Sequence, residues 1–227
     1  MPPIFPIHIQ RLSDNLLDVR ALVQIHEKIS GLGPGYEHYF EVLNKSAIVL
    51  IVACWEAYVE DLASFSFDRI LADVPDPKKW PQNVFALATK EIFKSNKPSR
   101  LLELTGNGWI NLLKHHRDNT IRRLHTPNAI RVDSLFDDLI GLPSLSSNWH
   151  WQGRSNEAAK KRLHDLLQLR HSIVHTVIAP KRIFKWNVSA AVDLINRLAV
   201  ISSNRVREYL ARKVNVTPWL PARVGKI

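Results

Sequence analysis

Apolar residues recur along most of the chain at the three- and four-residue spacing of an amphipathic helix, and the strict alternation of a half-buried strand is scarce. Gly and Pro residues separate the periodic segments, and Ser155 is placed to cap one of them. The pattern therefore predicts an all-α chain. The expected helices cover 11–30, 37–71, 83–94, 108–124, 129–140, 156–174 and 187–213, with Gly31 and Gly33-Pro34-Gly35 ending the first and Pro75 and Pro77 ending the second.

The longest uninterrupted apolar run, residues 47–55, ends at Glu56. A bilayer span needs about 20 apolar residues, so this run predicts a buried helix and no membrane association. The single cysteine, Cys54, lies in the same run and leaves no partner for an internal disulfide. The opening residues Met1-Pro-Pro-Ile-Phe-Pro lack the features of a secretory signal. We therefore expect a cytoplasmic protein.

Charge is distributed unevenly along the 227 residues, a length that fits a single domain over 1–227 with a substantial core. Residues 1–75 contain five Lys or Arg and ten Asp or Glu, whereas residues 76–227 contain 26 basic and 11 acidic residues. A basic field of this kind attracts a polyanion, although a charge run is more often only a solvated helix face.

The sequence Arg170-His171-Ser172-Ile173-Val174-His175 lies in the basic part and carries the strongest chemical signal. Cleavage of RNA by its own 2′-hydroxyl needs a base for that proton, an acid for the leaving 5′-oxygen and positive charge at the phosphate. Histidine, with an ordinary pKa of about 6.5, serves as base or acid near neutrality. Arginine stays charged and binds phosphate oxygens with its planar fork.

Helical spacing limits how these groups meet. Five residues advance an α-helix by about 500°, so Arg170 and His175 point roughly 140° apart. His171 and His175 share a face, while the long Arg170 side chain either wraps toward them or meets groups of a second copy. A symmetric dimer would place two copies of the set across one interface.

Three segments carry a family resemblance. The run from Ala159 to His175 (AKKRLHDLLQLRHSIVH) resembles the signature helix of the HEPN superfamily, in which Arg-x4–6-His follows an apolar helix. Residues 46–62 (SAIVLIVACWEAYVEDL) resemble the apolar Trp-Glu helix of the RiboL-PSP-type branch, and Trp149 to Gly153 adds a third match. Many members have Gly after the motif histidine, where this chain has Thr176.

The resemblance implies a four-helix up-and-down bundle with a core at about 11–75 and 155–213 and a helical insertion at about 76–151. It also implies a homodimer and a metal-independent endoribonuclease, with a toxin or antiviral-defence setting and with some members inactive. In this interpretation His175 is the principal acid-base residue, Arg170 stabilises the phosphate, and His171 positions substrate or shares proton transfer. Glu56 either holds Arg170 in place or is a half-exposed acid. The RNA-binding candidates are Lys160, Lys161, Arg162, Lys181, Arg182 and Lys185.

Other chemistries have weaker support. His171 and His175 have the spacing of zinc ligands, but Ser172 stands where a metalloprotease has Glu, and no CxxC pair occurs. We therefore expect no metal and no cofactor. Two alternatives to the nuclease stay open: a non-catalytic RNA-binding module, and a protein-interaction domain such as a toxin and antitoxin partner.

Aromatic and basic residues outside the motif have structural as well as functional interpretations. Trp55 is expected in the core rather than as a base-stacking platform. Trp149, His150 and Trp151 either stack an unpaired base or, as we favour, pack against the motif helix. A second basic cluster, which we expect to be mainly solvated surface, comprises His115, His116, Arg117, Arg122 and Arg123.

Overall fold

The computed structural model of the chain describes residues 5–30, 37–95, 97–177, 179–213, 215 and 217–224. These residues contain no β-strand, so the predicted all-α fold is confirmed. The helices along them are α1 (Ile7–Ser30), α2 (Glu37–Asp73), η1 (Pro77–Lys79), α3 (Gln82–Phe93), η2 (Pro98–Leu104), α4 (Gly108–Arg122), α5 (Ala129–Ile140), η3 (Leu145–Asn148), α6 (Asn156–Thr176) and α7 (Lys185–Lys213).

Local side-chain chemistry sets several helix ends where the sequence predicts them. The Ser155 hydroxyl accepts a hydrogen bond from the amide of Ala158 at the start of α6, and Asn128 caps α5 through the amide of Arg131. Gly141 ends α5 in the left-handed region at φ 71°. The Gly31 to Gly35 stop signals lie outside the described residues. Helix α1 begins four residues earlier than predicted, directly after Pro6, which has no N–H to leave unsatisfied.

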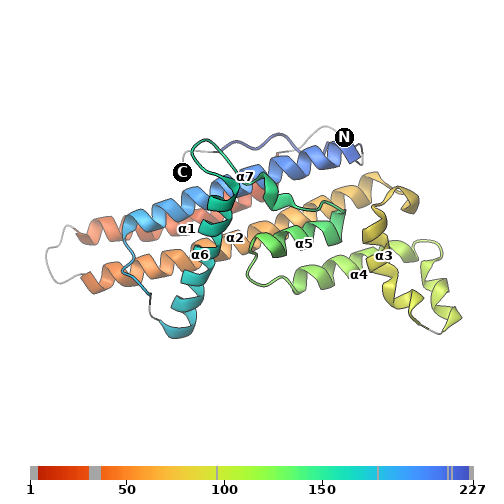
Figure 1. Ribbon diagram of the computed structural model, residues 1–227, viewed down its shortest axis with the longest axis horizontal. Coiled ribbons are helices and arrows are strands. Elements are labelled where there is room, and N and C mark those ends of the chain that lie inside the picture. Colours follow the sequence, from red (N-terminus) through yellow and green to blue (C-terminus); the bar gives the residue numbers. More distant parts are fainter. Residues whose placement is uncertain are drawn as a thin grey trace.

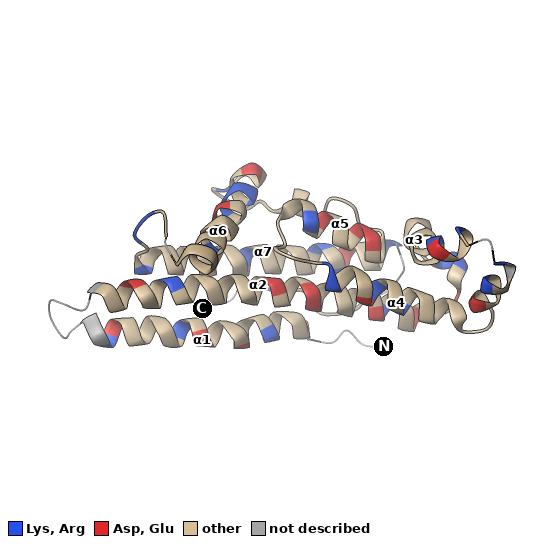
Figure 2. Ribbon diagram, turned by 90° about the horizontal axis from the view of Figure 1, so that it is seen from below, with Lys and Arg blue, Asp and Glu red and all other residues tan. Residues whose placement is uncertain are grey.

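Helices α1, α2 and α7 lie alongside one another, and α6 packs obliquely across α2 and α7 (Figure 1). Helices α3, α4 and α5, which connect α2 to α6, pack on one another, and α4 and α5 also pack on α2 (Figures 1 and 2). Tyr209 of α7 donates its hydroxyl to the carbonyls of Ile140 and Gly141, which ties this connecting segment to the long helices. The division into core and insertion stays a prediction.

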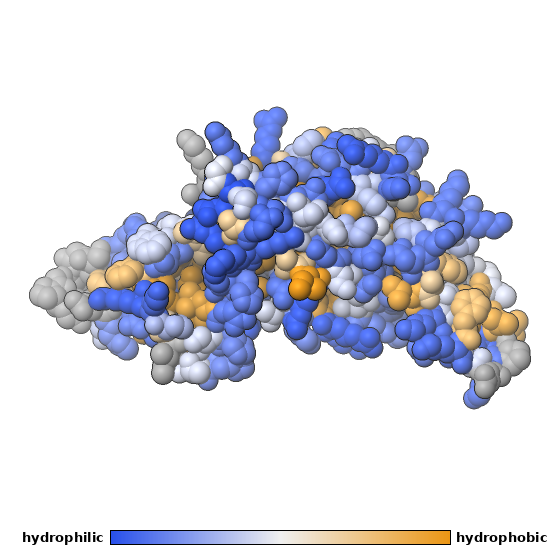
Figure 3. All heavy atoms as spheres, viewed as in Figure 1, coloured by the Kyte–Doolittle hydropathy of each residue, from blue (hydrophilic) through white to orange (hydrophobic). Residues whose placement is uncertain are grey.

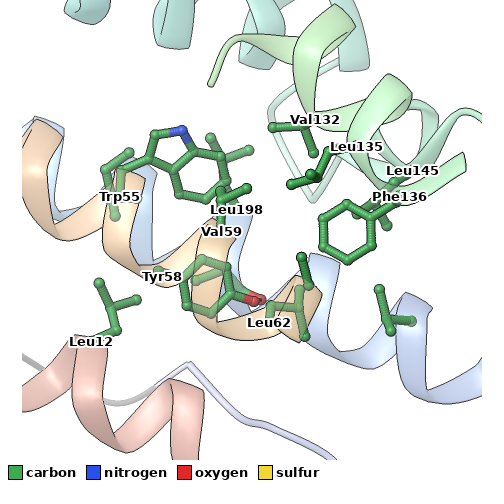
Figure 4. Packing of buried hydrophobic residues seen from close by; sticks show 14 of the residues in the cluster. Leu12, Trp55, Tyr58, Val59, Leu62, Val132, Leu135, Phe136, Leu145 and Leu198 are labelled. Carbon is green, nitrogen blue, oxygen red and sulfur yellow. Dashed lines mark hydrogen bonds between the residues drawn. The ribbon is translucent and has the colours of Figure 1, made fainter. Parts of the chain in front are cut away.

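One hydrophobic cluster runs through all of these helices and centres on α2 (Figure 4). Trp55 and Tyr58 are fully buried, and each polar head is satisfied: Trp55 Nε1 donates to the Pro127 carbonyl at 2.8 Å and the Tyr58 hydroxyl donates to the Ala199 carbonyl at 2.6 Å. The expected core position of Trp55 is thereby confirmed. Helix α2 is long and apolar enough to cross a membrane by length and composition alone, but half of its most apolar window is buried inside the protein.

A segment after α7 packs back onto the bundle, which the helical periodicity did not predict. Asn204 on α7 accepts from the amide of Ala222 at 2.8 Å and donates to its carbonyl at 3.0 Å. Arg207 donates to the Trp219 carbonyl at 2.8 Å, and the Trp219 side chain is only 3% exposed. Trp219 covers His8 of α1 in an edge-to-face contact with a centroid distance of 4.7 Å.

We predict that protonation of His8 destabilises the protein in mild acid. His8 is buried among aromatic rings with Nε2 2.8 Å from the Ser203 hydroxyl, and burial lowers the pKa of His8 to about 3. The unfolded chain, with a His pKa of about 6.5, binds this proton first, so stability falls as pH drops from 6.5 toward 3. This group should remove about 2 kcal/mol of unfolding free energy between pH 7 and pH 5.

Urea denaturation at the two pH values checks this expectation. The matched variant is His8→Gln, whose amide does not titrate and still reaches Ser203. Because both proteins contain the same carboxylates, the difference between their pH-dependent losses of unfolding free energy gives the contribution of His8. An identical pH dependence in both would contradict the assignment.

Candidate functional site

The motif residues occupy the last two turns of α6. Leu163, Leu166, Leu167 and Ile173 are buried and fix the helix against the bundle, which leaves the opposite side in solvent. His171 and His175 lie on that exposed side with their ring centroids 4.3 Å apart. The structure therefore brings the two histidines together on one accessible surface.

Arg170 points instead toward α2, where it meets Glu56. Its Nη2 lies 3.9 Å from Glu56 Oε2, and the two side chains are 29% and 27% exposed. This distance allows an ion pair but is too long for a hydrogen bond. Arg170 Nε is shielded from solvent, and no described residue accepts a hydrogen bond from it. Arg170 is thus partly buried between α6 and α2, and among the described residues its contact with Glu56 is an ion pair without a hydrogen bond.

A second carboxylate, Glu60, lies one turn further along α2. Partial burial raises the pKa of Glu60, and the neighbouring Glu56 and Asp61 raise it further, while His125 acts in the opposite sense. Among the described residues no Lys or Arg forms an ion pair with Glu60. This edge of α2 therefore carries two neighbouring acidic groups, and of these Glu56 pairs with an arginine.

The end of α6 departs from the Gly-terminated helix of many relatives. Thr176 donates its hydroxyl to the Ser172 carbonyl at 2.7 Å and remains helical. Val177 then takes the left-handed conformation at φ 59°, and its amide donates to the Ile173 carbonyl at 3.0 Å. Lys45 on α2 donates to the Val177 carbonyl at 3.2 Å and anchors this end. A β-branched residue is strained in this conformation, which glycine adopts freely.

The basic residues upstream of the motif lie away from it. From Arg162 to His175 the helix rises by roughly 20 Å. Lys161 pairs with Asp165 at 3.0 Å on the helix surface. Lys160, Lys161 and Arg162 would therefore contact a ligand that also reaches the motif only if that ligand runs along α6.

The downstream basic residues lie in the connection from α6 to α7 and at the first residue of α7, together with two exposed aromatic residues. Arg182 lies 5.6 Å over the ring of Phe184, and Lys185 pairs with Glu27 of α1. Phe184 is 47% exposed and Trp186 is 65% exposed. We did not select these aromatic residues from the sequence, although their alternation with cations in the segment 181–186 was a usable signal.

The tryptophan pair before α6 has a packing role. Trp149 is fully buried, contacts Trp55 edge-to-face at 5.9 Å and donates from Nε1 to the Ser202 hydroxyl at 2.9 Å. Arg197 of α7 lies 5.5 Å over the Trp151 ring. Trp149 is therefore a core residue rather than a base-stacking platform, but the ring contact and the hydrogen bond of its side chain are made with α2 and α7 and not, as we expected, with the motif helix.

The second basic cluster is partly engaged in structural contacts. Arg117 pairs with Asp68 and Asp118 and lies 5.4 Å over the Phe67 ring. His116 Nε2 is 2.9 Å from the Asp138 carbonyl. Exposed members of the cluster line an open groove of about 800 Å³ between α3, α4 and α5. In the described part of the chain, no three His, Cys, Asp or Glu side chains are grouped to hold a metal ion; that the protein needs no metal or cofactor stays a prediction.

The fold and the motif helix together define an all-α domain of HEPN type. The RiboL-PSP-HEPN family model matches residues 10–204, and the chain belongs to this family. Among curated proteins and among solved structures, none matches the chain significantly.

We predict that the Glu56 and Arg170 pair contributes little to stability. The Glu56→Gln variant should lose less than about 1 kcal/mol of unfolding free energy, because the pair is partly exposed and lacks a hydrogen bond. Glu60→Gln is the control and should be neutral or stabilising near pH 7, since its carboxylate has a raised pKa. Denaturant titrations measure both. A loss of about 3 kcal/mol or more for Glu56→Gln would instead indicate a tightly coupled buried pair.

We also predict that Val177→Gly stabilises the protein by about 1 kcal/mol, because it removes the left-handed strain at the end of α6. Val174→Gly, one turn earlier and also solvent-exposed, should destabilise the protein by about 1 kcal/mol through the low helix propensity of glycine. Thermal and urea unfolding compare the two variants. Destabilisation by both would show that Val177 is not strained.

Proposed function

We propose that the protein is a metal-independent endoribonuclease that cuts RNA by attack of a 2′-hydroxyl on the adjacent phosphate. The family supports a role in cleaving or binding RNA. The observation that carries the cleavage proposal is the grouping of two exposed histidines and one partly exposed arginine on the last two turns of α6. These are the acid, the base and the phosphate ligand that the reaction requires.

In the proposed reaction the 2′-oxygen forms a bond to phosphorus as the bond to the 5′-oxygen breaks. One histidine takes the 2′-hydroxyl proton, and a proton is delivered to the leaving 5′-oxygen. The products are a 2′,3′-cyclic phosphate and a 5′-hydroxyl. We assign the principal acid-base role to His175, substrate positioning or shared proton transfer to His171, and stabilisation of the growing phosphate charge to Arg170.

A homodimer forms part of the proposal. Arg170 lies at the α2 edge while His171 and His175 face solvent, so one α6 helix does not direct all three at one phosphorus atom. A second copy packed against this surface supplies the missing partner and makes a shared site. A cytoplasmic location, a toxin or antiviral-defence setting and a regulatory partner such as an antitoxin are also proposed, and they rest on the family resemblance and the sequence.

The charge distribution supports RNA as the ligand. Lys and Arg residues occur at several positions along α6 and in the connection to α7 (Figure 2). The face seen in Figure 3, which has the orientation of Figure 1, is largely hydrophilic, with hydrophobic surface beside the C-terminal end of α6. We propose that the phosphate backbone of RNA contacts the basic side chains of Lys160, Lys161, Arg162, Lys181, Arg182 and Lys185. Such contacts should make RNA binding salt-dependent.

The decisive experiment incubates wild-type and His175→Ala protein with total RNA in EDTA. Wild type should give fragments that end in 2′,3′-cyclic phosphate, and His175→Ala should be about 10²- to 10⁴-fold slower. His115→Ala, which removes an exposed histidine on α4, is the matched control and should cut at the wild-type rate. Equal rates for wild type and His175→Ala would overturn the mechanism.

Two other outcomes would redirect the assignment. RNA that is bound in a salt-sensitive manner but left uncut by wild type would favour a non-catalytic RNA-binding module. Tight binding to a partner protein with no affinity for RNA would favour an interaction domain.

A further inference from the structure

The end of the connection from α6 and the first turn of α7 expose two aromatic rings on a fixed backbone. Ile183 is buried, and Asn44 of α2 donates to its carbonyl at 2.8 Å. The amide of Phe184 donates to the Asn187 side chain at 2.8 Å. Phe184 and Trp186 nevertheless keep 47% and 65% of their surface in solvent. A large exposed aromatic surface on an anchored segment indicates contact with a ligand or partner.

These rings border a concave surface at the end of the bundle, where α1, α2 and α7 meet. Its volume is about 620 Å³, within the range of small-molecule pockets. His26 and Phe40, whose ring centroids are 4.6 Å apart, form its inner wall. Its aromatic and cationic lining residues are His26, Phe40, Arg182, Phe184, Lys185 and Trp186. Glu41 also lines the surface but is paired with Lys45, so the rim presents Arg182 and Lys185 beside one acidic group.

The cations at the rim are suited to a polyanion. Arg182 and Lys185 line the surface, and Lys181 directly precedes Arg182 in the chain. The Lys185 pair with Glu27 is solvent-exposed on both sides, so a phosphate can replace the carboxylate at little free-energy loss. Arg182 stacks on Phe184, which extends the flat surface with a charged plane.

We infer that Trp186 and Phe184 form a stacking site for unpaired bases, and that the substrate is therefore single-stranded RNA. The inference rests on the proposed RNA-directed function but not on cleavage. Flat aromatic rings next to phosphate-binding cations are the combination that binds single strands. Bases inside a duplex are already stacked and do not reach such a surface. The alternation of Arg182 and Lys185 with Phe184 and Trp186 matches the alternating phosphates and bases of a single strand, and a protein partner has no such repeat.

The stacking site is continuous with the motif helix. His175 and Trp186 are separated by ten residues, and the Lys45 contact with the Val177 carbonyl fixes the beginning of this connection. The C-terminal end of α6 and the N-terminal end of α7 both lie toward the same end of the bundle (Figure 1). In this inference, a strand bound at the histidines extends toward Trp186, and this residue then contributes to the choice of substrate.

The test measures binding of three RNA probes to full-length protein in the His175→Ala background, which prevents cleavage. The probes are a 12-nucleotide single strand, the same strand with abasic sites, and a 12-base-pair duplex. Trp186→Ala should weaken binding of the base-bearing strand by about 5- to 100-fold and leave the abasic strand and the duplex unchanged. Trp186→Phe should retain most of the affinity. Lys181→Gln should weaken all three probes together.

Phe93→Ala is the matched control, because it removes an aromatic ring that is 66% exposed at the end of α3, and it should change none of the affinities. Unaltered thermal unfolding of Trp186→Ala shows that the fold is intact. Equal single-strand affinity with and without Trp186, or equal loss for all three probes, overturns the stacking site. A base-dependent Trp186 effect in a protein that never cuts RNA supports the stacking site while the nuclease proposal fails.

Discussion

Burial of α2 is the constraint on which the rest of the structure depends. This helix is apolar around much of its circumference, and it contacts α1, α4, α5, α6 and α7. Its two large aromatic residues would be unfavourable in the core if their polar atoms were unpaired. Trp55 and Tyr58 meet this requirement through carbonyls of Pro127 and Ala199, which come from segments distant in the sequence. The same contacts that satisfy α2 therefore fix the loop before α5 and the middle of α7.

The candidate site follows from how α6 meets that central helix. The buried leucines of α6 determine which of its faces is covered, and the motif positions fall on either side of the boundary. Arg170 is left half-buried against Glu56, while both histidines are left in solvent. The way in which α6 packs on the bundle therefore leaves Arg170 beside Glu56 and both histidines accessible to solvent. A helix with the same motif but a different apolar face would present these groups in a different arrangement.

The sequence predicted the long helices because their apolar spacing and their end signals are local. Ser155 and Gly141 illustrate this: the cap and the left-handed stop act within a few residues of themselves. Features that depend on distant contacts were missed. The segment around Trp219 has no helical period, and its place is set by Asn204, Arg207 and His8. The exposure of Trp186 was equally invisible to periodicity, because only the packed structure shows which rings remain uncovered.

The sequence left two roles open for Glu56, a partner that holds Arg170 in place or a half-exposed acid. The structure places Glu56 beside Arg170 with both side chains partly exposed. A bidentate, buried partner would hold the guanidinium too strongly for a phosphate to compete. At 3.9 Å and with both groups partly exposed, Glu56 orients Arg170 electrostatically without occupying its donors. Glu60 lies nearby on α2, and partial burial together with the charge of Glu56 raises its pKa. In the proposed reaction, a phosphate that approaches Arg170 would therefore meet a guanidinium that Glu56 restrains only weakly.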